Sequence, residues 1–447
     1  MAVIELGLVH PDGDDSSPDP GRGPLPRREL RRLLVALVAV CCVLTVTGSA
    51  RPDPRGLVQL WGTRFTQDGY EFRLAGDSVY VLSQVDGRRL TAYDARTGAV
   101  RWSTADLDDQ TWMTAVQDGV LLMPAGSARV THEEPDGTRS WREFSRDTTA
   151  LDTVTGRPLW RGRGEVAAVV GDRVLLSEWN GTGDRARRMR MVRLRDGGTV
   201  WSRDRGDLTY WATDTTAGAG AERLLTLDPD GRAEALAIAD GSVVTTGRLP
   251  WSGSTQGEDY SMVTVTGRRL YLDQTVHNQS SVTAYDADTL RRLWRVEQPS
   301  SGGSYACGPV VCVSDGTTVA GHDRETGALR WRLPAAMNGF LLPGGRLIVE
   351  EEGGARSTLL DAATGRRLAD LGPATPVWDS LGRATAYLVA GTRQPAGLTS
   401  VSRFDPASGE VVLRGTIMPV LDYACQYEDD LLACATQDNR LVVTDVG

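Results

Sequence analysis

Short apolar runs separated by polar or glycine-containing turns follow one another from about residue 56 to the end of the chain. The stretch 70–93 is typical, because apolar runs at 70–74, 78–82 and 89–93 are each followed by a turn sequence. Runs of about five residues bounded by such turns are typical of β-strands joined by hairpins. The pattern therefore predicts an all-β chain of short strands.

One phrase recurs along this pattern at spacings of 37 to 58 residues. Each copy follows two apolar runs, so a repeat comprises three strands and a fourth strand that ends at tryptophan. The phrase reads TAYDARTGAVRW at 91–102, and it returns at 149–160, 283–294 and 320–331, with weaker copies at 192–201, 235–244, 358–369 and 402–413.

The residues of the phrase indicate structural roles. An aspartate such as Asp94 accepts hydrogen bonds from backbone N–H groups two or three residues later, and Gly98 supplies the positive φ of a short loop. The tryptophans share one register, and we expect each to bury its ring between adjacent repeats. They are Trp102, Trp160, Trp201, Trp294 and Trp331.

Four-stranded units of this length, repeated around an axis, predict a β-propeller. The two ends of the chain fit closure of such a ring. Residues 439–447 resemble the third strand of a repeat, and residues 56–61 resemble the fourth strand that would follow it. We therefore expect the first strand of the propeller to complete the last blade.

The phrase Y/L-D-x-x-T-G-x-x-x-W resembles the repeat of pyrroloquinoline-quinone-like (PQQ-like) propellers, and the chain is similar to the BamB-like family. The resemblance covers roughly residues 56–447, and the lack of lysine fits an actinobacterial, membrane-anchored member. Counting Asp445 gives nine repeat marks, whereas the family usually has eight blades. We predict eight blades, with nine as the alternative.

The N-terminal region predicts a membrane anchor. Residues 1–32 are rich in Asp, Pro, Gly and Ser and predict a disordered cytoplasmic tail that ends in four arginines. Residues 33–50 are apolar and predict a transmembrane signal-anchor, although cleavage after residue 50 stays open. Positive charge stays on the cytoplasmic side, so residues 51–447 are expected to form an extracytoplasmic propeller in a single-pass membrane protein.

Charge excludes several functions. The net charge of −9 argues against binding to nucleic acid, and every one of the 49 basic residues is arginine. Phosphate-binding loops and Schiff-base chemistry that require lysine are therefore excluded. Glu350, Glu351 and Glu352 are expected to be a solvated strand end.

The last four cysteines are expected to form two disulfides, Cys307 with Cys312 and Cys425 with Cys434. Each pair occupies the first two strands of a repeat at what look like equivalent positions, after Tyr305-Ala and Tyr423-Ala. Neighbouring antiparallel strands bring side chains close enough for such a bond, and an oxidising compartment permits it.

An aromatic residue recurs near the start of each first strand, which lines the central channel of a propeller. Packing between blades and binding of a ligand at one channel mouth both fit this pattern. The candidates for binding are Trp112, Trp211, Tyr260, Tyr305, Trp378 and Tyr423, with Tyr70 and Phe340 in the same series.

We expect a non-enzymatic scaffold that binds a protein or peptide partner at the cell envelope, with no cofactor and no metal. A sensor for a sugar or cell-wall fragment is one alternative, and a quinone-dependent dehydrogenase is another. The resemblance implies that such dehydrogenases use a disulfide between adjacent cysteines, a calcium site and a catalytic aspartate. The only adjacent cysteines here, Cys41 and Cys42, lie in the predicted anchor.

Overall fold

The computed structural model describes residues 56–447, apart from 68–69, 85–86, 106, 108–111, 134–138, 214–220, 252–258, 301 and 383. The predicted tail at 1–32 and anchor at 33–50 lie outside this range. Within the range that is described, no helix is long and apolar enough to cross a membrane.

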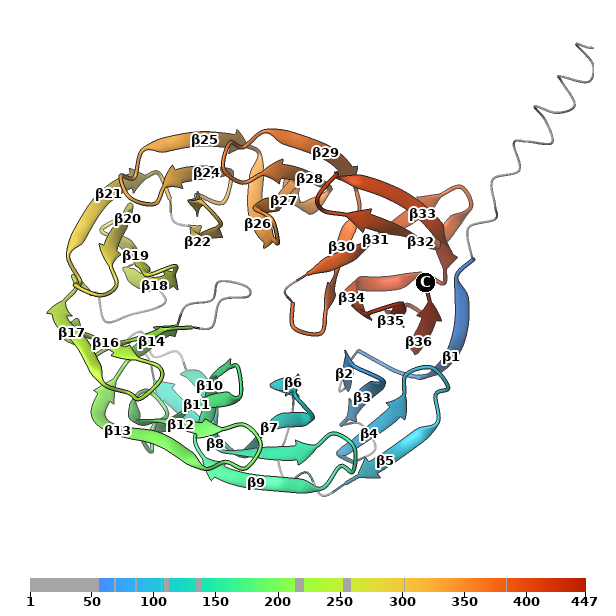
Figure 1. Cartoon of the computed structure of the whole chain (residues 1–447), viewed down its shortest axis with the longest axis horizontal. Coiled ribbons are helices and arrows are strands. Elements are labelled where there is room, and N and C mark those ends of the chain that lie inside the picture. The colour runs from blue at the N-terminus through green and yellow to red at the C-terminus, as the bar shows by residue number, and fades with distance from the viewer. Residues whose placement is uncertain are drawn as a thin grey trace, which may run out of the picture. The chain divides into compact units, whose positions relative to one another are not determined.

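The strands form four-stranded blades arranged in a ring (Figure 1). Blade 1 contains β2 (Tyr70–Ala75), β3 (Ser78–Ser83), β4 (Arg89–Asp94) and β5 (Val100–Thr104). Blade 2 contains β6 (Ala115–Gln117), β7 (Val120–Glu133), β8 (Arg139–Asp152) and β9 (Pro158–Arg163), and blade 3 contains β10 (Glu165–Val170), β11 (Arg173–Trp179), β12 (Ala186–Arg193) and β13 (Thr199–Leu208).

The middle blades follow the same order. Blade 4 contains β14 (Tyr210–Thr213), β15 (Arg223–Leu227), β16 (Arg232–Ala237) and β17 (Val243–Arg248). Blade 5 contains β18 (Tyr260–Thr266), β19 (Arg269–Val276), β20 (Gln279–Asp286) and β21 (Arg292–Gln298), and blade 6 contains β22 (Gly303–Cys307), β23 (Val310–Ser314), β24 (Thr318–Asp323) and β25 (Leu329–Pro334).

The last blades complete the ring. Blade 7 contains β26 (Ala336–Leu342), β27 (Arg346–Glu351), a short 3-10 turn at Glu352–Gly354, β28 (Arg356–Asp361) and β29 (Arg367–Gly372). Blade 8 contains β30 (Thr375–Asp379), β31 (Thr385–Arg393), β32 (Ala396–Asp405) and β33 (Glu410–Ile417), and blade 9 contains β34 (Val420–Glu428), β35 (Leu431–Thr436), β36 (Arg440–Asp445) and β1 (Val58–Arg64).

The all-β architecture of four-stranded sheets confirms the predicted fold class, but the prediction of eight blades is wrong. Seven separate four-stranded sheets and one eight-stranded sheet are present among the described residues. The eight-stranded sheet consists of blades 8 and 9, joined by the short parallel pairing of β30 with β34. Each of the nine repeat marks therefore belongs to a blade of its own, including the weak copies at 192–201 and 235–244.

Closure of the ring follows the prediction. Strand β1 pairs antiparallel with β36, from Val58 opposite Asp445 to Arg64 opposite Arg440. The N-terminal strand thus supplies the fourth strand of blade 9, and both ends of the propeller meet in one sheet.

Adjacent blades are joined at their outer strands by a repeated set of contacts, which we call the latch. At the seam between blades 6 and 7, Asp361 Oδ1 accepts hydrogen bonds from the backbone N–H and the hydroxyl of Thr364, at 3.1 and 2.8 Å. Gly365 has a φ of +67°, and a Cβ there would lie 2.5 Å from the Trp331 ring. The Trp331 indole N–H donates to the Ala362 carbonyl at 2.9 Å.

The same indole-to-carbonyl bond crosses five other seams, so the expected role of the tryptophans as packing residues between repeats is confirmed. Its donors are Trp61, Trp102, Trp160, Trp201 and Trp294. The apolar core lies between the blades, as where Leu74 and Val79 of blade 1 pack with Ala433 and Leu441 of blade 9.

The two ends of the ring carry different turns between strands. In most blades, the residue after the repeat mark donates a backbone hydrogen bond to the turn between the first and second strands, as Ala362 does to Gly345 at 3.0 Å. The residue after the repeat mark lies in the turn between the third and fourth strands. This turn and the turn between the first and second strands therefore lie at the same end of the ring, which we call the turn face. The turns between the second and third strands lie at the other end, the connector face.

Candidate functional site

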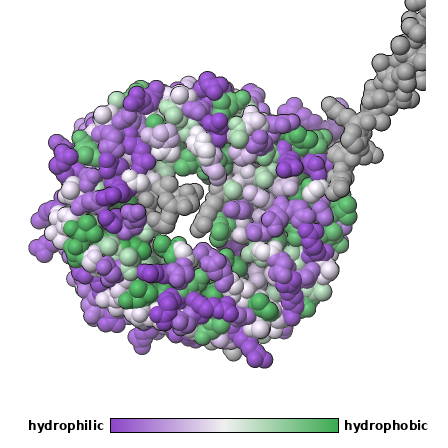
Figure 2. All heavy atoms as spheres, viewed as in Figure 1, coloured by the Kyte–Doolittle hydropathy of each residue, from purple (hydrophilic) through white to green (hydrophobic). Residues whose placement is uncertain are grey.

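A cavity of about 730 Å³ lies among the first strands of several blades, where they surround the axis of the ring. The space-filling view shows an opening near the centre of the molecule (Figure 2). Residues from β2, β6, β10, β22, β26, β30 and β34 line the cavity, together with the turn after β30. Because this turn and Gln117 precede second strands, the cavity lies toward the turn face.

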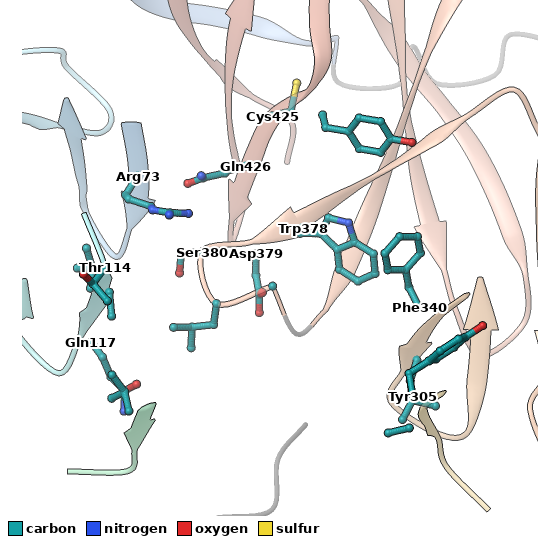
Figure 3. Close-up of a pocket in the computed structure, with 18 of the residues that line it drawn as sticks. Arg73, Thr114, Gln117, Tyr305, Phe340, Trp378, Asp379, Ser380, Cys425 and Gln426 are labelled. Atoms are coloured by element: carbon teal, nitrogen blue, oxygen red, sulfur yellow. The ribbon is translucent and has the colours of Figure 1, made fainter. Parts of the chain in front are cut away.

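Aromatic side chains form one wall of the cavity. Figure 3 shows Tyr305, Phe340 and Trp378 on one side, facing Arg73 and Gln117 across the space. The rings of Phe340 and Trp378 have centroids 5.4 Å apart and are tilted by 54°. Rings in this arrangement offer apolar faces to a ligand while their edges stay packed.

The Tyr305 ring is fixed by close contact with the next blade. A Cβ on Gly339 would lie 2.7 Å from the Tyr305 Oη, so this position leaves room for the ring only as glycine. The buried hydroxyl of Tyr305 has no hydrogen-bond partner among the described residues, and burial raises the pKa of Tyr305.

The opposite wall is polar, but its side chains already bond to the backbone of neighbouring blades. Gln426 of blade 9 accepts a hydrogen bond from the Leu74 N–H at 2.9 Å, and Gln117 of blade 2 donates to the Gly171 carbonyl at 2.9 Å. The lining residue Arg73 pairs at 3.0 Å with Glu71, which does not line the cavity and accepts from the Met113 N–H at 2.8 Å. Burial raises the pKa of Glu71 despite these two partners.

The structure brings together three of the six residues that the sequence analysis singled out. Tyr305, Trp378 and Tyr423 line the cavity together with Phe340. The other three do not line it. Trp211 packs against Trp179, with ring centroids 5.1 Å apart, Trp112 precedes β6, and Tyr260 is the first residue of β18. The sequence pattern predicted that these aromatic residues stand at the same position near the start of each first strand. In the structure they stand at different positions along the first strands, so only some of them reach the cavity.

Tyr423 reaches the cavity from a bulge in β34. The pairing of β34 with β35 shifts between Val420 and Cys425, and Tyr423 within the bulge has a φ of +54°. Its side chain is 63% exposed, and its hydroxyl donates to Glu350 Oε1 of blade 7 at 2.9 Å. This hydrogen bond is the main cause that raises the pKa of Tyr423.

The expectation that Glu350 and Glu351 form a solvated strand end is wrong. Both side chains are buried, at 8% and 5% exposure. Glu350 accepts the Tyr423 hydroxyl, and Glu351 pairs with Arg367 at 3.0 Å. Each carboxylate is buried with a partner from another strand, although Glu351 Oε1 has no hydrogen-bond partner among the described residues. A run of like charges in the sequence does not reveal such partners.

The structure contains disulfides between Cys307 and Cys312 and between Cys425 and Cys434. Each joins the first two strands of one blade, but the positions are not equivalent. Cys425 lies directly opposite Cys434, whereas Cys312 lies opposite Tyr305 and bonds diagonally to Cys307. The bulge that carries Tyr423 ends at Cys425, so the second disulfide holds the base of this bulge.

Sequence reasoning missed most of the polar wall and the turn after β30. Arg73, Gln117 and Gln426 lie outside the repeat phrase, and Ser380 and Leu381 lie in an ordinary-looking turn. The sequence does hold one signal for these residues, which is a polar residue inside a first strand, such as Arg73 in YEFRLA. Such a residue could have been identified as a candidate for the central cavity.

The lining residues do not fit a quinone with calcium, the cofactor that the resemblance brings to mind. Calcium requires six to eight oxygen ligands, several of them carboxylates. Asp379 is the single carboxylate among the described lining residues, and the described chain contains no cluster of three or more His, Cys, Asp or Glu side chains able to hold a metal ion.

Residues 278–419 match a family model described as outer membrane protein assembly factor BamB. No curated protein matches the chain in sequence. Among solved structures, BamB from Moraxella catarrhalis is 16% identical with a TM-score of 0.44, over 87% of this chain and 99% of that one. A europium-containing methanol dehydrogenase is 13% identical with a TM-score of 0.38, over 62% and 72%. A eukaryotic initiation factor is 10% identical with a TM-score of 0.47, over 78% and 88%.

The family match covers the second half of blade 5 and all of blades 6 to 8. The repeat phrase and the latch extend the same pattern around the ring. The chain is a PQQ-like β-propeller repeat protein.

Proposed function

We propose that this protein is a non-enzymatic scaffold outside the cytoplasm that holds a protein or peptide partner at the central cavity. The observation that carries this proposal is the difference between the two cavity walls. The polar side chains of Gln117 and Gln426 are bonded to neighbouring blades. The aromatic faces of Phe340 and Trp378 line the open space and are available to an apolar or amphipathic side chain.

The two disulfides support a location outside the cytoplasm, because such bonds persist in oxidising compartments. The arginines ahead of residue 33 and the apolar stretch 33–50 support attachment to the membrane with the propeller outside. The match of residues 278–419 to a family described as outer membrane protein assembly factor BamB supports a role at the cell envelope.

Crosslinking in intact cells followed by mass spectrometry tests this function. The full-length protein should crosslink to one predominant protein partner, and Trp378→Ala should reduce the yield at least about tenfold, as loss of an aromatic anchor does. Leu329→Ala is the control, because Leu329 is 53% exposed on an outer strand away from the cavity.

Other outcomes would replace the proposal. If a sugar or cell-wall fragment raised the thermal stability of the wild type and Trp378→Ala abolished this effect, the cavity would be a carbohydrate site. If the purified protein oxidised an alcohol after addition of quinone and calcium, the scaffold function would be wrong.

A further inference from the structure

A long hairpin rises from the connector face of blade 2. Strands β7 and β8 have 14 residues each, whereas the other second and third strands described have five to ten. Their pairing keeps one register from Val120 opposite Asp152 to Glu133 opposite Arg139, with a gap only at Gly126 and Arg146. Phe144 of the hairpin is 3% exposed and packs where Gly183 of blade 3 has no side chain. The hairpin is therefore held against the β11–β12 turn.

This part of an acidic protein is basic. Residues 139–205 contain 15 arginines against nine aspartates and glutamates, which gives a net charge of +6, whereas the whole chain carries −9. Charges of one sign gathered on one sector of a surface attract ligands of the opposite sign.

Five arginines of residues 139–205 are exposed and form no ion pair with a described carboxylate. Arg157 lies on the turn face, and the other four, Arg142, Arg146, Arg163 and Arg187, lie toward the connector face. The carboxylates around them already have partners. Glu178 lies 3.6 Å from Arg188 and 3.9 Å from Arg190, and Asp147 pairs with Arg161 at 3.0 Å.

Three of these arginines, Arg142, Arg146 and Arg163, lie where β8 and β9 meet blade 3. The Arg142 guanidinium lies 4.4 Å above the Trp179 ring of blade 3. Arg190 donates to the Arg163 carbonyl at 2.6 Å, and the N–H of Gly164 donates to the Arg146 carbonyl at 2.7 Å. Trp141, which is 61% exposed with Arg129 4.5 Å above its ring, alternates with Arg142 along β8 and so faces the opposite side of the hairpin.

We propose that this surface, the hairpin–blade 3 patch, binds an acidic, extended peptide segment of a partner protein. Planar guanidinium groups donate two parallel hydrogen bonds to a carboxylate, which suits the Asp and Glu side chains of an extended peptide. On β8, Glu143 and Asp147 directly follow Arg142 and Arg146. Glu178 and Asp204 lie beside Arg188 of β12, so a flat anionic bilayer would meet charges of both signs. A peptide places single carboxylates against single guanidinium groups.

The patch lies on the connector face, whereas the central cavity lies toward the turn face. The proposal therefore stands on different residues from the proposed function, and the two can fail separately. Binding to the patch should be unaffected by Trp378→Ala.

The test measures fluorescence anisotropy of a labelled oligoglutamate mixed with the full-length protein in a neutral detergent. Wild type should bind saturably, and Arg142→Glu with Arg146→Glu should weaken binding at least about tenfold, because repulsion replaces charge-assisted hydrogen bonds. The control combines Arg157→Glu with Arg366→Glu, which changes the net charge equally at two exposed arginines on the turn face.

Equal weakening by both double variants would overturn the proposal, because net charge and not the patch would then govern binding. Binding to vesicles of anionic lipid without binding to oligoglutamate would assign the patch to the membrane and would also overturn it. If the charge-reversed protein failed to fold by circular dichroism, Arg142→Gln with Arg146→Gln should still give several-fold weaker binding.

Discussion

The outer and inner strands of this propeller differ in how strictly they repeat. At six of the nine seams between blades in the described structure, the outer strand contributes a tryptophan whose N–H bonds to the next blade. The inner strands share no comparable contact. Gln426 bonds to a backbone N–H, Glu71 accepts from Met113, and Tyr423 crosses to Glu350 from a bulge.

The difference has a physical cause. At each of the six seams that a tryptophan closes, the outer turn must supply a residue with positive φ and space for the ring. Blade 5 shows the dependence, because Leu290 takes the glycine position with a φ of +52° next to blade 4, whose outer strand has no tryptophan. The inner strands face the axis of the propeller, where no tryptophan of a neighbouring blade requires one particular residue type. The residue types on these strands can therefore vary with the ligand.

The largest expected effect separates the two regions directly. Trp331→Ala should lower the free energy of unfolding by about 3 to 5 kcal/mol, because it empties a buried site and leaves the Ala362 carbonyl unpaired. Trp378→Ala should lower it by about 1 kcal/mol or less, since one face of that ring already borders the cavity. Urea titration followed by circular dichroism measures both. Equal losses would mean that the inner aromatic wall is part of the structural core.

Asp273 gives a pH-dependent contrast within the inner part of blade 5. This carboxyl is fully buried, burial raises its pKa to about 7, and the Ser304 hydroxyl of blade 6 donates to it at 2.6 Å. The folded state therefore holds a proton that the unfolded state releases near pH 4. Through this group, stability should fall as the pH rises from about 4 to 7 and should then stay constant.

Asp273→Asn should remove that dependence and raise stability at pH 8 by up to about 4 kcal/mol, which is the limit set by a shift of this size. Unfolding midpoints of variant and wild type, measured from pH 4 to 8, give the difference curve. A constant difference across this range would show that Asp273 is ionised in the folded protein.

The repeat phrase allowed the sequence to predict most of the outer region, including the Asp361 turn, the Trp331 contact and closure by β1. It did so because each of these features depends on residues a few positions apart or on one repeated register. Blade number was predicted wrongly, since the weak copies around Arg193 and Ala237 lack the aspartate yet still form the turn between the third and fourth strands.

The inner region was predicted only in part. Tyr305 and Trp378 line the cavity as their positions suggested, whereas Trp211 packs between blades. A bulge such as the one before Cys425 shifts the register, and burial of Glu350 depends on a tyrosine 73 residues away. Such contacts depend on the closed ring and leave no local signal.

The disulfide at the base of the Tyr423 bulge should have a smaller effect. Replacing Cys425 and Cys434 by alanine should lower stability by about 2 kcal/mol, as expected for a loop this short. The same change should weaken partner capture more than replacement of Cys307 and Cys312, because Cys425 itself lines the cavity and ends the bulge that carries Tyr423. Peptide mapping without reduction verifies the pairing first, and a bond between Cys307 and Cys425 would contradict the blade assignment.

The smallest effect concerns one latch glycine. Gly365→Ala and Gly344→Ala both place a side chain at positive φ, but only the first would meet a ring, that of Trp331. Each should lose about 1 kcal/mol from backbone strain, and Gly365→Ala should lose about 1 to 2 kcal/mol more from the contact. Identical thermal shifts for the two variants would show that the ring adapts and that the latch does not require glycine.

Recognition at the inner strands is tested most directly by a photoreactive amino acid placed in the cavity. Leu381 lines the cavity on the turn after β30 and is 42% exposed, and Val154, on the outer turn of blade 2, is 74% exposed on the same face. Benzoylphenylalanine at 381 should crosslink in intact cells to the partner that Trp378→Ala loses, and the same group at 154 should not. Crosslinking of that partner at 154 and not at 381 would place recognition on the outer region and contradict the central cavity as the binding site.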